Sequence, residues 1–405
     1  MFQGEVQGRM AAVRFTGARS ELFGILLRGY ILMVPTIGVH RFWLTTRKRR
    51  FFWSHTEIDG DPLEYTGHAL QLLIGFLFAV GIFLPLYGVF FYLNTQSSET
   101  ALLGLSVIAG LLWFLSGYAI YRARDFRLSR TLWRGIRFDQ GGSAWGYAFR
   151  RFGWSILMVL TAGLIYPFMA ANLWRYRYSH TWYGDRRFSF GGRAGRLAGP
   201  YYLVYFLVAV LGLVTLFYTF GTRALTLVNG ILVPDATATL LLIATSLVLW
   251  IGSYYYRARE ISRMLSSVRV GDCALTLTLR ARAMFWQFIV YGLACLGAAI
   301  AFAIIGAMLF YGLFADVMRG EGAQELTTIV EGGIVNVLLL ILSYLIVMGT
   351  LSLLGEVFLG CGYWMLLCRG ALLANADSLR SVRARGEDSS LAGEGLADAL
   401  NVGAY

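Results

Sequence analysis

The sequence predicts an all-α polytopic membrane protein with an internal duplication, and three observations lead to this fold class. Hydrophobic residues make up 57% of the 405 residues, and charged residues only 14%. A soluble domain carries about a quarter charged residues, so this chain cannot cover a globular surface of normal size with polar side chains. The apolar residues also gather in eight long segments, and one stretch of the sequence recurs. Together these observations exclude an ordinary water-soluble domain.

The eight apolar segments set the number of predicted membrane helices. They cover about 22–43, 69–93, 101–121, 152–173, 200–220, 237–256, 284–315 and 334–368. A helix needs roughly 20 apolar residues to cross about 30 Å of hydrocarbon. Six of the segments are predicted to be full transmembrane helices.

The other two segments, 25–43 and 152–173, are predicted to be re-entrant or broken, so that each enters the membrane and leaves on the same side. The helix-breaking residues are Pro35, Thr36, Gly38, Thr161, Gly163 and Pro167. Proline and glycine interrupt a helix, and a threonine hydroxyl can bond a freed carbonyl. A kinked helix that spans the membrane is the alternative, which the sequence leaves open.

The distribution of basic residues favours the re-entrant arrangement. The net charge of +12 comes almost wholly from arginine, since Lys48 is the only lysine. With two re-entrant segments, nearly all basic residues lie on one side, and the loops on the other side hold only Arg223 and Arg319. Basic loops remain in the cytoplasm. The pattern therefore predicts that both termini are cytoplasmic, and it indicates contact with anionic phospholipids rather than nucleic acid.

Four pieces within the arginine-rich polar segments have the alternating pattern of short β-hairpins. They are HTEIDGDPLEYTG (55–67), GIRFDQGGSAWGY (135–147), HTWYGDRRFSFGG (180–192) and VRVGDCALTLTLR (268–280). Each contains glycine at the expected bend, three times as Asp-Gly or Gly-Asp and once as Gln-Gly-Gly, which favours a tight hairpin turn. We expect these hairpins on the cytosolic side, packed together or against helix ends.

The duplication divides the chain. Residues 31–67 align without gaps on 156–192, so that Ser54-His55-Thr56 matches Ser179-His180-Thr181. A second repeat follows: the Tyr-Arg-Ala-Arg-Asp sequence that ends at Asp125 recurs as Tyr-Arg-Ala-Arg-Glu, which ends at Glu260. The predicted divisions are an N-terminal cytosolic strand (1–21), membrane repeats at 22–135 and 136–266, a C-terminal hairpin and helix pair (267–373) and a polar tail (374–405).

Three polar residues are candidates for a polar or proton site: His55 and His180, which could together form a symmetric proton or metal site, and Glu356. His55 and His180 occupy equivalent places, where a bond to a headgroup or a strand carbonyl is the simpler interpretation. Glu356 is the only acid well inside an apolar run, and an ionisable group in a membrane helix is a functional hypothesis by default. A place near the membrane interface is the alternative for Glu356. The four cysteines lack the spacing of metal ligands, so we expect no metal.

Four arginines end two predicted spans at equivalent positions and are candidates for binding lipid headgroups. They are Arg122, Arg124, Arg257 and Arg259. Long basic side chains can instead anchor a helix end by reaching to the interface, which is the structural alternative.

Several motifs resemble those of the YjgN-type bacterial inner-membrane family. They are PTIGVHRFWLTTRKRRFFWSHTEIDGDPLEYTGHALQLLIGFL, YRARDFRLSRTLWRGIRF, LTAGLIYPF, HTWYGDRRFSF and GEGLADALNVG, which together extend over nearly the whole chain. The resemblance implies an inner-membrane location and a helical architecture, and it brings no catalytic residue or cofactor.

Two functional hypotheses follow. One is a transporter or channel-like protein, because duplicated halves with broken helices recur in transporters. The alternative is a module that binds anionic lipid or partner proteins through its basic face without transporting anything. No motif of an enzyme is present, so we expect no enzymatic activity. The sequence identifies no substrate and no oligomeric state.

Overall fold

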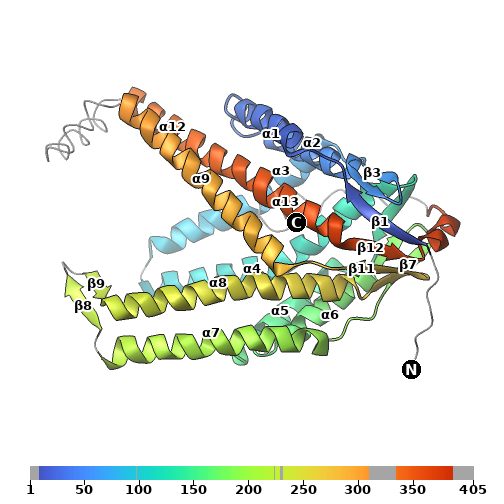
Figure 1. Cartoon of the computed structure of the whole chain (residues 1–405). Coiled ribbons are helices and arrows are strands. Elements are labelled where there is room, and N and C mark those ends of the chain that lie inside the picture. The colour runs from blue at the N-terminus through green and yellow to red at the C-terminus, as the bar shows by residue number, and fades with distance from the viewer. Residues whose placement is uncertain (1–8, 97, 223, 229–230, 310–333, 386–405) are drawn as a thin grey trace.

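Long helices extend from one end of a small β-barrel in the computed structural model (Figure 1). The structure describes residues 9–96, 98–222, 224–228, 231–309 and 334–385. The first eight residues of the predicted N-terminal strand segment and most of the predicted polar tail, from 386 onward, lie outside the described residues.

Ten short strands form the closed barrel, so the predicted all-α fold class is wrong. In order around the barrel they are β1 (Met10–Phe15), β12 (Ala371–Ala374), β11 (Cys273–Leu277), β10 (Val268–Val270), β7 (Arg186–Phe190), β6 (Thr181–Tyr183), β5 (Ile136–Gln140), β4 (Thr131–Trp133), β3 (Asp61–Tyr65) and β2 (Thr56–Ile58). Every neighbouring pair is antiparallel.

The predicted arrangement of short hairpins is wrong as well, because the hairpins bond edge to edge and form one continuous barrel. An isolated two-stranded hairpin leaves unpaired backbone groups and is marginal in water. Here β3 pairs with β4 through Leu63 and Trp133, and β1 closes the ring between β2 and β12, with Met10 opposite Ala374. Closure leaves no free edge in the barrel.

Five connections between consecutive barrel strands are long, and each of them contains a pair of helices. The pairs are α1 (Arg19–Met33) with α2 (Arg41–Ser54), α3 (Ala69–Asn94) with α4 (Ser98–Ser129), α5 (Ala144–Leu160) with α6 (Tyr166–Ser179), α7 (Gly195–Gly221) with α8 (Ala236–Leu265), and α9 (Ala281–Leu309) with a last helix. That last helix consists of α12 (Ile334–Leu354), the π-helix η1 (Gly355–Gly360) and α13 (Cys361–Gly370). Since all strands alternate in direction, all five pairs leave the same end of the barrel.

The helices contact one another in sequence order, from α1 through α9 to α12 and back to α1. Six of the described helices are long and apolar enough to cross a membrane: Ala69–Asn94, Glu99–Ser129, Gly195–Gly221, Ala236–Leu265, Ala281–Met308 and Ile341–Gly370. Their outer surfaces expose many large apolar side chains, such as Phe78, Phe217 and Met308. A small two-stranded sheet, β8 (Leu225–Val228) and β9 (Ile231–Pro234), joins α7 to α8 at the end far from the barrel (Figure 1).

The pairs α1–α2 and α5–α6 are too short to span. The 15 residues of α1 extend about 22 Å, against about 30 Å of hydrocarbon. Each pair begins and ends at the barrel, because β1 and β2 are bonded neighbours, as are β5 and β6. Both pairs are therefore helical hairpins that return to the side from which they left.

The two bends have the same backbone path. Gly38 and Gly163 have φ values of 81° and 91°, in the left-handed region that glycine adopts without strain, and each follows a residue with φ of 48°. The hydroxyls of Thr36 and Thr161 donate to the carbonyls four residues earlier, at 2.7 and 2.8 Å. Pro35 lies in the first bend, and Pro167 lies in the first turn of α6, where no N–H donor is needed.

Three tyrosines of α7 hold the second bend. The hydroxyls of Tyr205, Tyr201 and Tyr202 donate to the carbonyls of Ala162, Gly163 and Leu164 at 2.8, 2.7 and 3.0 Å. Backbone carbonyls at membrane depth need such partners. The first bend is more open, and the Ile37 side chain at its tip is 93% exposed.

The barrel interior is a packed core. Trp133, Tyr183 and Cys273 point inward and contact Leu379 and Val382 of the segment after β12, which contains the 3-10 helix η2 (Ala376–Ser381). The backbone N–H of Asp185 donates to the Arg383 carbonyl at 2.9 Å, so this segment lies over the turn between β6 and β7. Large side chains therefore fill the barrel.

Candidate functional site

The last helix contains an irregular turn where its single acid lies. Residues Gly355–Gly360 form a π-helix, an irregularity that often marks a functional site. The carboxylate of Glu356 accepts a hydrogen bond from Nζ of Lys48 on α2 at 2.7 Å. One turn earlier, the hydroxyls of Ser352 and Tyr30 bond at 2.7 Å. The only lysine of the chain thus pairs with the one acid inside an apolar run, and two polar contacts join α1–α2 to the last helix.

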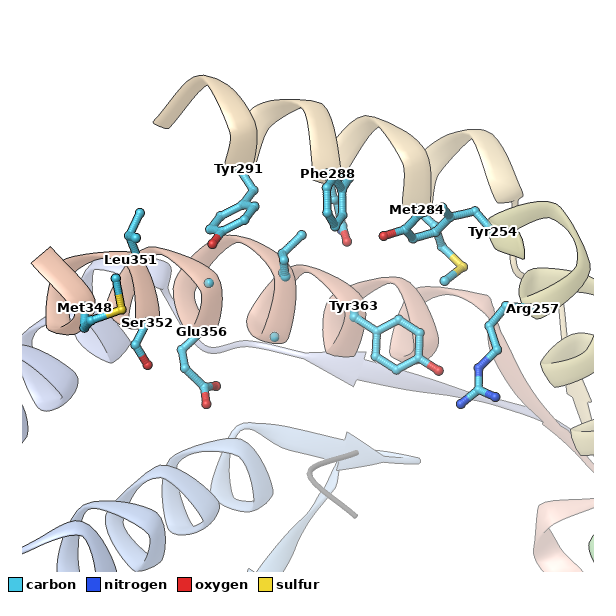
Figure 2. A pocket seen from close by; sticks show the side chains of 14 residues that line it. Tyr254, Arg257, Met284, Phe288, Tyr291, Met348, Leu351, Ser352, Glu356 and Tyr363 are labelled. Carbon is cyan, nitrogen blue, oxygen red and sulfur yellow. The ribbon is translucent and has the colours of Figure 1, made fainter. Parts of the chain in front are cut away.

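A cavity of about 670 Å³ lies between α8, α9 and the last helix. Its lining residues are Tyr254, Arg257, Met284, Gln287, Phe288, Tyr291, Met348, Leu351, Ser352, Gly355, Glu356, Leu359, Gly360 and Tyr363. Figure 2 shows Met284, Phe288 and Tyr291 extending from α9 toward the last helix, with Arg257 at one end of the row and Met348 at the other. The walls are largely apolar, and the polar groups are few, as in ligand-binding pockets generally.

The four candidate arginines have different environments. Arg124 donates to Gln140 Oε1, Thr181 Oγ1 and the Arg177 carbonyl at 2.5, 3.0 and 3.2 Å, so it joins α4 to the barrel and to α6. Arg122 forms a salt bridge of 3.0 Å with Asp125. Among the four, Arg124 and Arg122 are thus occupied by protein partners.

Arg257 is the equivalent of Arg122, yet it lacks the equivalent ion pair. The acid three residues later, Glu260, accepts instead from the Trp174 indole N–H at 2.9 Å. Among the described residues, the exposed Arg257 guanidinium has no hydrogen-bond or salt-bridge partner. Arg259, also exposed, lies over the Tyr255 ring at 5.5 Å and does not line the cavity. The structure therefore leaves one unpaired cation at the end of the cavity nearer the barrel.

A comparison with protein families matches residues 10–399 to the family described as "Bacterial protein of unknown function (DUF898)". The chain belongs to this family. The match confirms the resemblance to YjgN-type proteins, and together with the six apolar helices it supports a membrane protein of unestablished role. No curated protein and no solved structure gives a significant match.

The two candidate histidines of this DUF898 protein are not brought into one site. Each ends a helix, and its Nδ1 bonds the carbonyl four residues earlier: His55 to Phe51 at 2.8 Å, and His180 to Tyr176 at 2.7 Å. The Nε2 atom of His55 lies 3.5 Å from Glu21. Within the described ranges, no group of three or more His, Cys, Asp or Glu side chains could hold a metal ion.

Sequence reasoning missed most of the cavity lining in this DUF898 protein. Gln287 and Tyr291 lie one turn apart on α9, and they pack near Gly362 and Gly355 of the last helix, which lack side chains that would block the approach. Glycines at a spacing of seven in the last helix were a signal for close packing. The partner helix could not be identified from that signal alone.

Proposed function

We propose that this membrane protein binds an anionic amphiphile, such as a phospholipid or a fatty acid, in the cavity between α8, α9 and the last helix. The unpaired Arg257 guanidinium at one end of an apolar cavity is the observation that supports the proposal. Arginine presents a planar fork of N–H donors that matches a carboxylate or a phosphate. An apolar chain would then lie along Phe288, Leu351 and Met348, away from the barrel.

The size of the cavity fits such a ligand. A volume of about 670 Å³ is within the range of roughly 300–1,000 Å³ for small-molecule sites. The lining from Tyr363 to Met348 covers about 22 Å of helix at 1.5 Å per residue. One leaflet of hydrocarbon is about 15 Å thick, so an acyl chain and part of its headgroup can be accommodated along this length.

Native mass spectrometry in mild detergent tests the proposal with a matched pair of variants. The substitution Arg257→Gln is expected to reduce bound anionic lipid about tenfold, because a lost charge-assisted hydrogen bond is worth roughly 1.5–3 kcal/mol. Arg259→Gln removes the same charge two residues away, outside the cavity, and is expected to change bound lipid less than twofold. Equal effects of the two substitutions, or no effect of either, would contradict the cavity as the site.

Transport of the bound amphiphile is a second candidate function. Two broken helical pairs occupy matching places in the duplicated sequence, and the first is joined to the cavity lining by Lys48–Glu356 and Tyr30–Ser352. Duplicated units with broken helices recur in transporters. Faster exchange of a fluorescent anionic lipid between leaflets of proteoliposomes, lost in Arg257→Gln, is expected; exchange no faster than in protein-free liposomes would rule this function out.

We further propose a bacterial inner-membrane location with the barrel and both termini in the cytoplasm. The support is the excess of arginine in the barrel strands and their flanks, since basic segments remain on the cytoplasmic side.

Cysteine labelling in oriented vesicles checks the arrangement. Cys introduced at Asp272, in a barrel turn, is expected to react with a membrane-impermeant reagent only from the cytoplasmic side, and Cys at Gln96, at the far end of α3, only from the opposite side. Cys at Ile37 is expected to react from neither side, because the first bend ends within the bilayer. The native Cys273 thiol is expected to add little background labelling. Burial raises its pKa to about 11, so little of the reactive thiolate is present at neutral pH. Labelling of position 37 from the side of Gln96 would establish a spanning segment instead.

A further inference from the structure

A second hollow, of about 340 Å³, lies where α7 begins and α8 ends, beside the barrel. It is lined by Arg196, Ser262, Arg263, Ser266 and Leu277. None of these residues lines the cavity that contains Arg257, and Arg263 is about 9 Å further along α8 by helical rise. If α7 and α8 span the bilayer, this hollow is at the level of the lipid headgroups.

The side chain of one arginine in the hollow contacts the main chain of the other, and no acidic side chain takes part. Nη1 of Arg263 donates to the main-chain carbonyl of Arg196. Nη1 of Arg196 donates to Ser267 Oγ at 3.1 Å. Neither guanidinium forms a salt bridge among the described residues, so neutral oxygens are its only partners there.

The serines beside them hold the barrel to α8. Ser266 Oγ accepts from the backbone N–H of Leu277, and Ser262 Oγ accepts from that of Leu279, both at 2.8 Å. These bonds fix the end of α8 against β11. The hollow therefore has a rigid floor, and the two guanidinium groups have fixed attachment points on it.

At the matching place in the first half, Arg127 is in the last turn of α4, as Arg263 is in the last turn of α8, and Arg130 follows it. Continuing the alignment of 31–67 with 156–192 by four residues places Gln71 opposite Arg196, and the Oε1 of Gln71 accepts from Arg130 Nε at 3.3 Å. In the second half that amide is replaced by the guanidinium of Arg196, which donates to Ser267 Oγ. Both guanidinium groups line the same hollow, and an anion that contacts both would offset the repulsion between these like charges.

We infer that Arg196 and Arg263 form a binding site for a phosphate group. Each guanidinium has five N–H donors, so the bonds above leave several of them available. Two planar forks can hold the oxygens of one phosphate bidentately, which lysine cannot do. The phosphate belongs either to an anionic phospholipid headgroup or to a free phosphate, and both present the same oxygens to the site.

The test uses full-length protein carrying Arg257→Gln, so that the cavity does not contribute. Binding of a short-chain phosphatidylglycerol below its micellar concentration is measured by calorimetry, with inorganic phosphate as competitor. The double substitution Arg196→Gln/Arg263→Gln is expected to weaken binding at least about tenfold. Arg193→Gln removes an exposed charge three residues earlier, before α7 begins and outside the hollow, and is expected to weaken binding less than twofold.

The competitor distinguishes the two sources of phosphate. Displacement of phosphatidylglycerol by millimolar inorganic phosphate identifies a free-phosphate site, and resistance to it identifies a headgroup site. Should the double variant fail to fold, Arg263→Lys keeps the charge but loses the fork, and a loss of about threefold or more is expected. Undiminished binding in the folded variants, or an equal loss in Arg193→Gln, would overturn the inference.

Discussion

Replacing Lys48 with methionine is expected to lower the free energy of unfolding by about 2 kcal/mol. The substitution removes the ammonium group 2.7 Å from Glu356 Oε1. Removing one partner of a fully buried pair costs about 3–5 kcal/mol. The loss expected here is smaller, about 2 kcal/mol, because the two side chains are 23% and 21% exposed to solvent. Unfolding in mixed detergent, followed by circular dichroism, measures the change.

A double-mutant cycle separates the ion pair from other effects of the substitution. The combination Lys48→Met/Glu356→Leu is expected to recover most of the loss, since an apolar pair is no worse than a buried ion pair. Lys48→Arg retains the charge and is the conservative control. Additive effects, with a coupling below roughly 0.5 kcal/mol, would show that the pair does not stabilise the contact between α2 and the last helix.

Replacing Trp133 with alanine is expected to have the largest effect, about 3–5 kcal/mol. The Trp133 side chain is 2% exposed and packs inside the barrel against Tyr183, whose hydroxyl donates to the Trp133 carbonyl at 3.1 Å. Trp182, the next residue before Tyr183, is only half-buried and makes cation–π contacts with Arg187 and Arg385. Trp182→Ala is therefore the control, with an expected loss of about 1 kcal/mol. Equal losses would contradict a barrel closed around Trp133.

The same core predicts a pH dependence. Burial raises the pKa of Tyr183 to about 12, from about 10 in an unfolded chain. Between these values the unfolded protein binds fewer protons than the folded one, so stability falls as pH rises from 10 to 12. In Tyr183→Phe the fall in this interval is expected to be smaller.

The sequence predicted three of the four hairpin turns and missed the barrel. The bend predicted at Gln140–Gly142 is wrong, because the turn lies at Arg134-Gly135, between β4 and β5. Asp59 and Gly60 form the bend between β2 and β3 with positive φ values, as the Asp-Gly pattern indicated. Strand pairs such as Leu63–Trp133 and Met10–Ala374 join residues that are separated by entire helices. Periodicity within a hairpin carries no information on which distant strand bonds to its outer edge.

The candidate site was predicted in part. Arg257 and Glu356 were singled out as a helix-end cation and a membrane acid, each from its own segment. Arg257 and Glu356 line one cavity because α8, α9 and the last helix pack together. No spacing of residues in the sequence indicates that these three helices are neighbours. The free guanidinium of Arg257 depends in turn on Trp174, which bonds Glu260. Nothing in the sequence near Arg257 indicates that contact.

Photocrosslinking tests the central proposal most directly. An anionic phospholipid with a diazirine in its acyl chain is incorporated into membranes containing the protein, and crosslinked residues are mapped by mass spectrometry. Crosslinks at Phe288, Leu351 or Leu359 are expected, and Arg257→Gln is expected to remove them without affecting those at the outward-facing Phe78. Crosslinks confined to outward-facing residues such as Phe78 and Leu70, and unchanged by Arg257→Gln, would contradict amphiphile binding in the cavity.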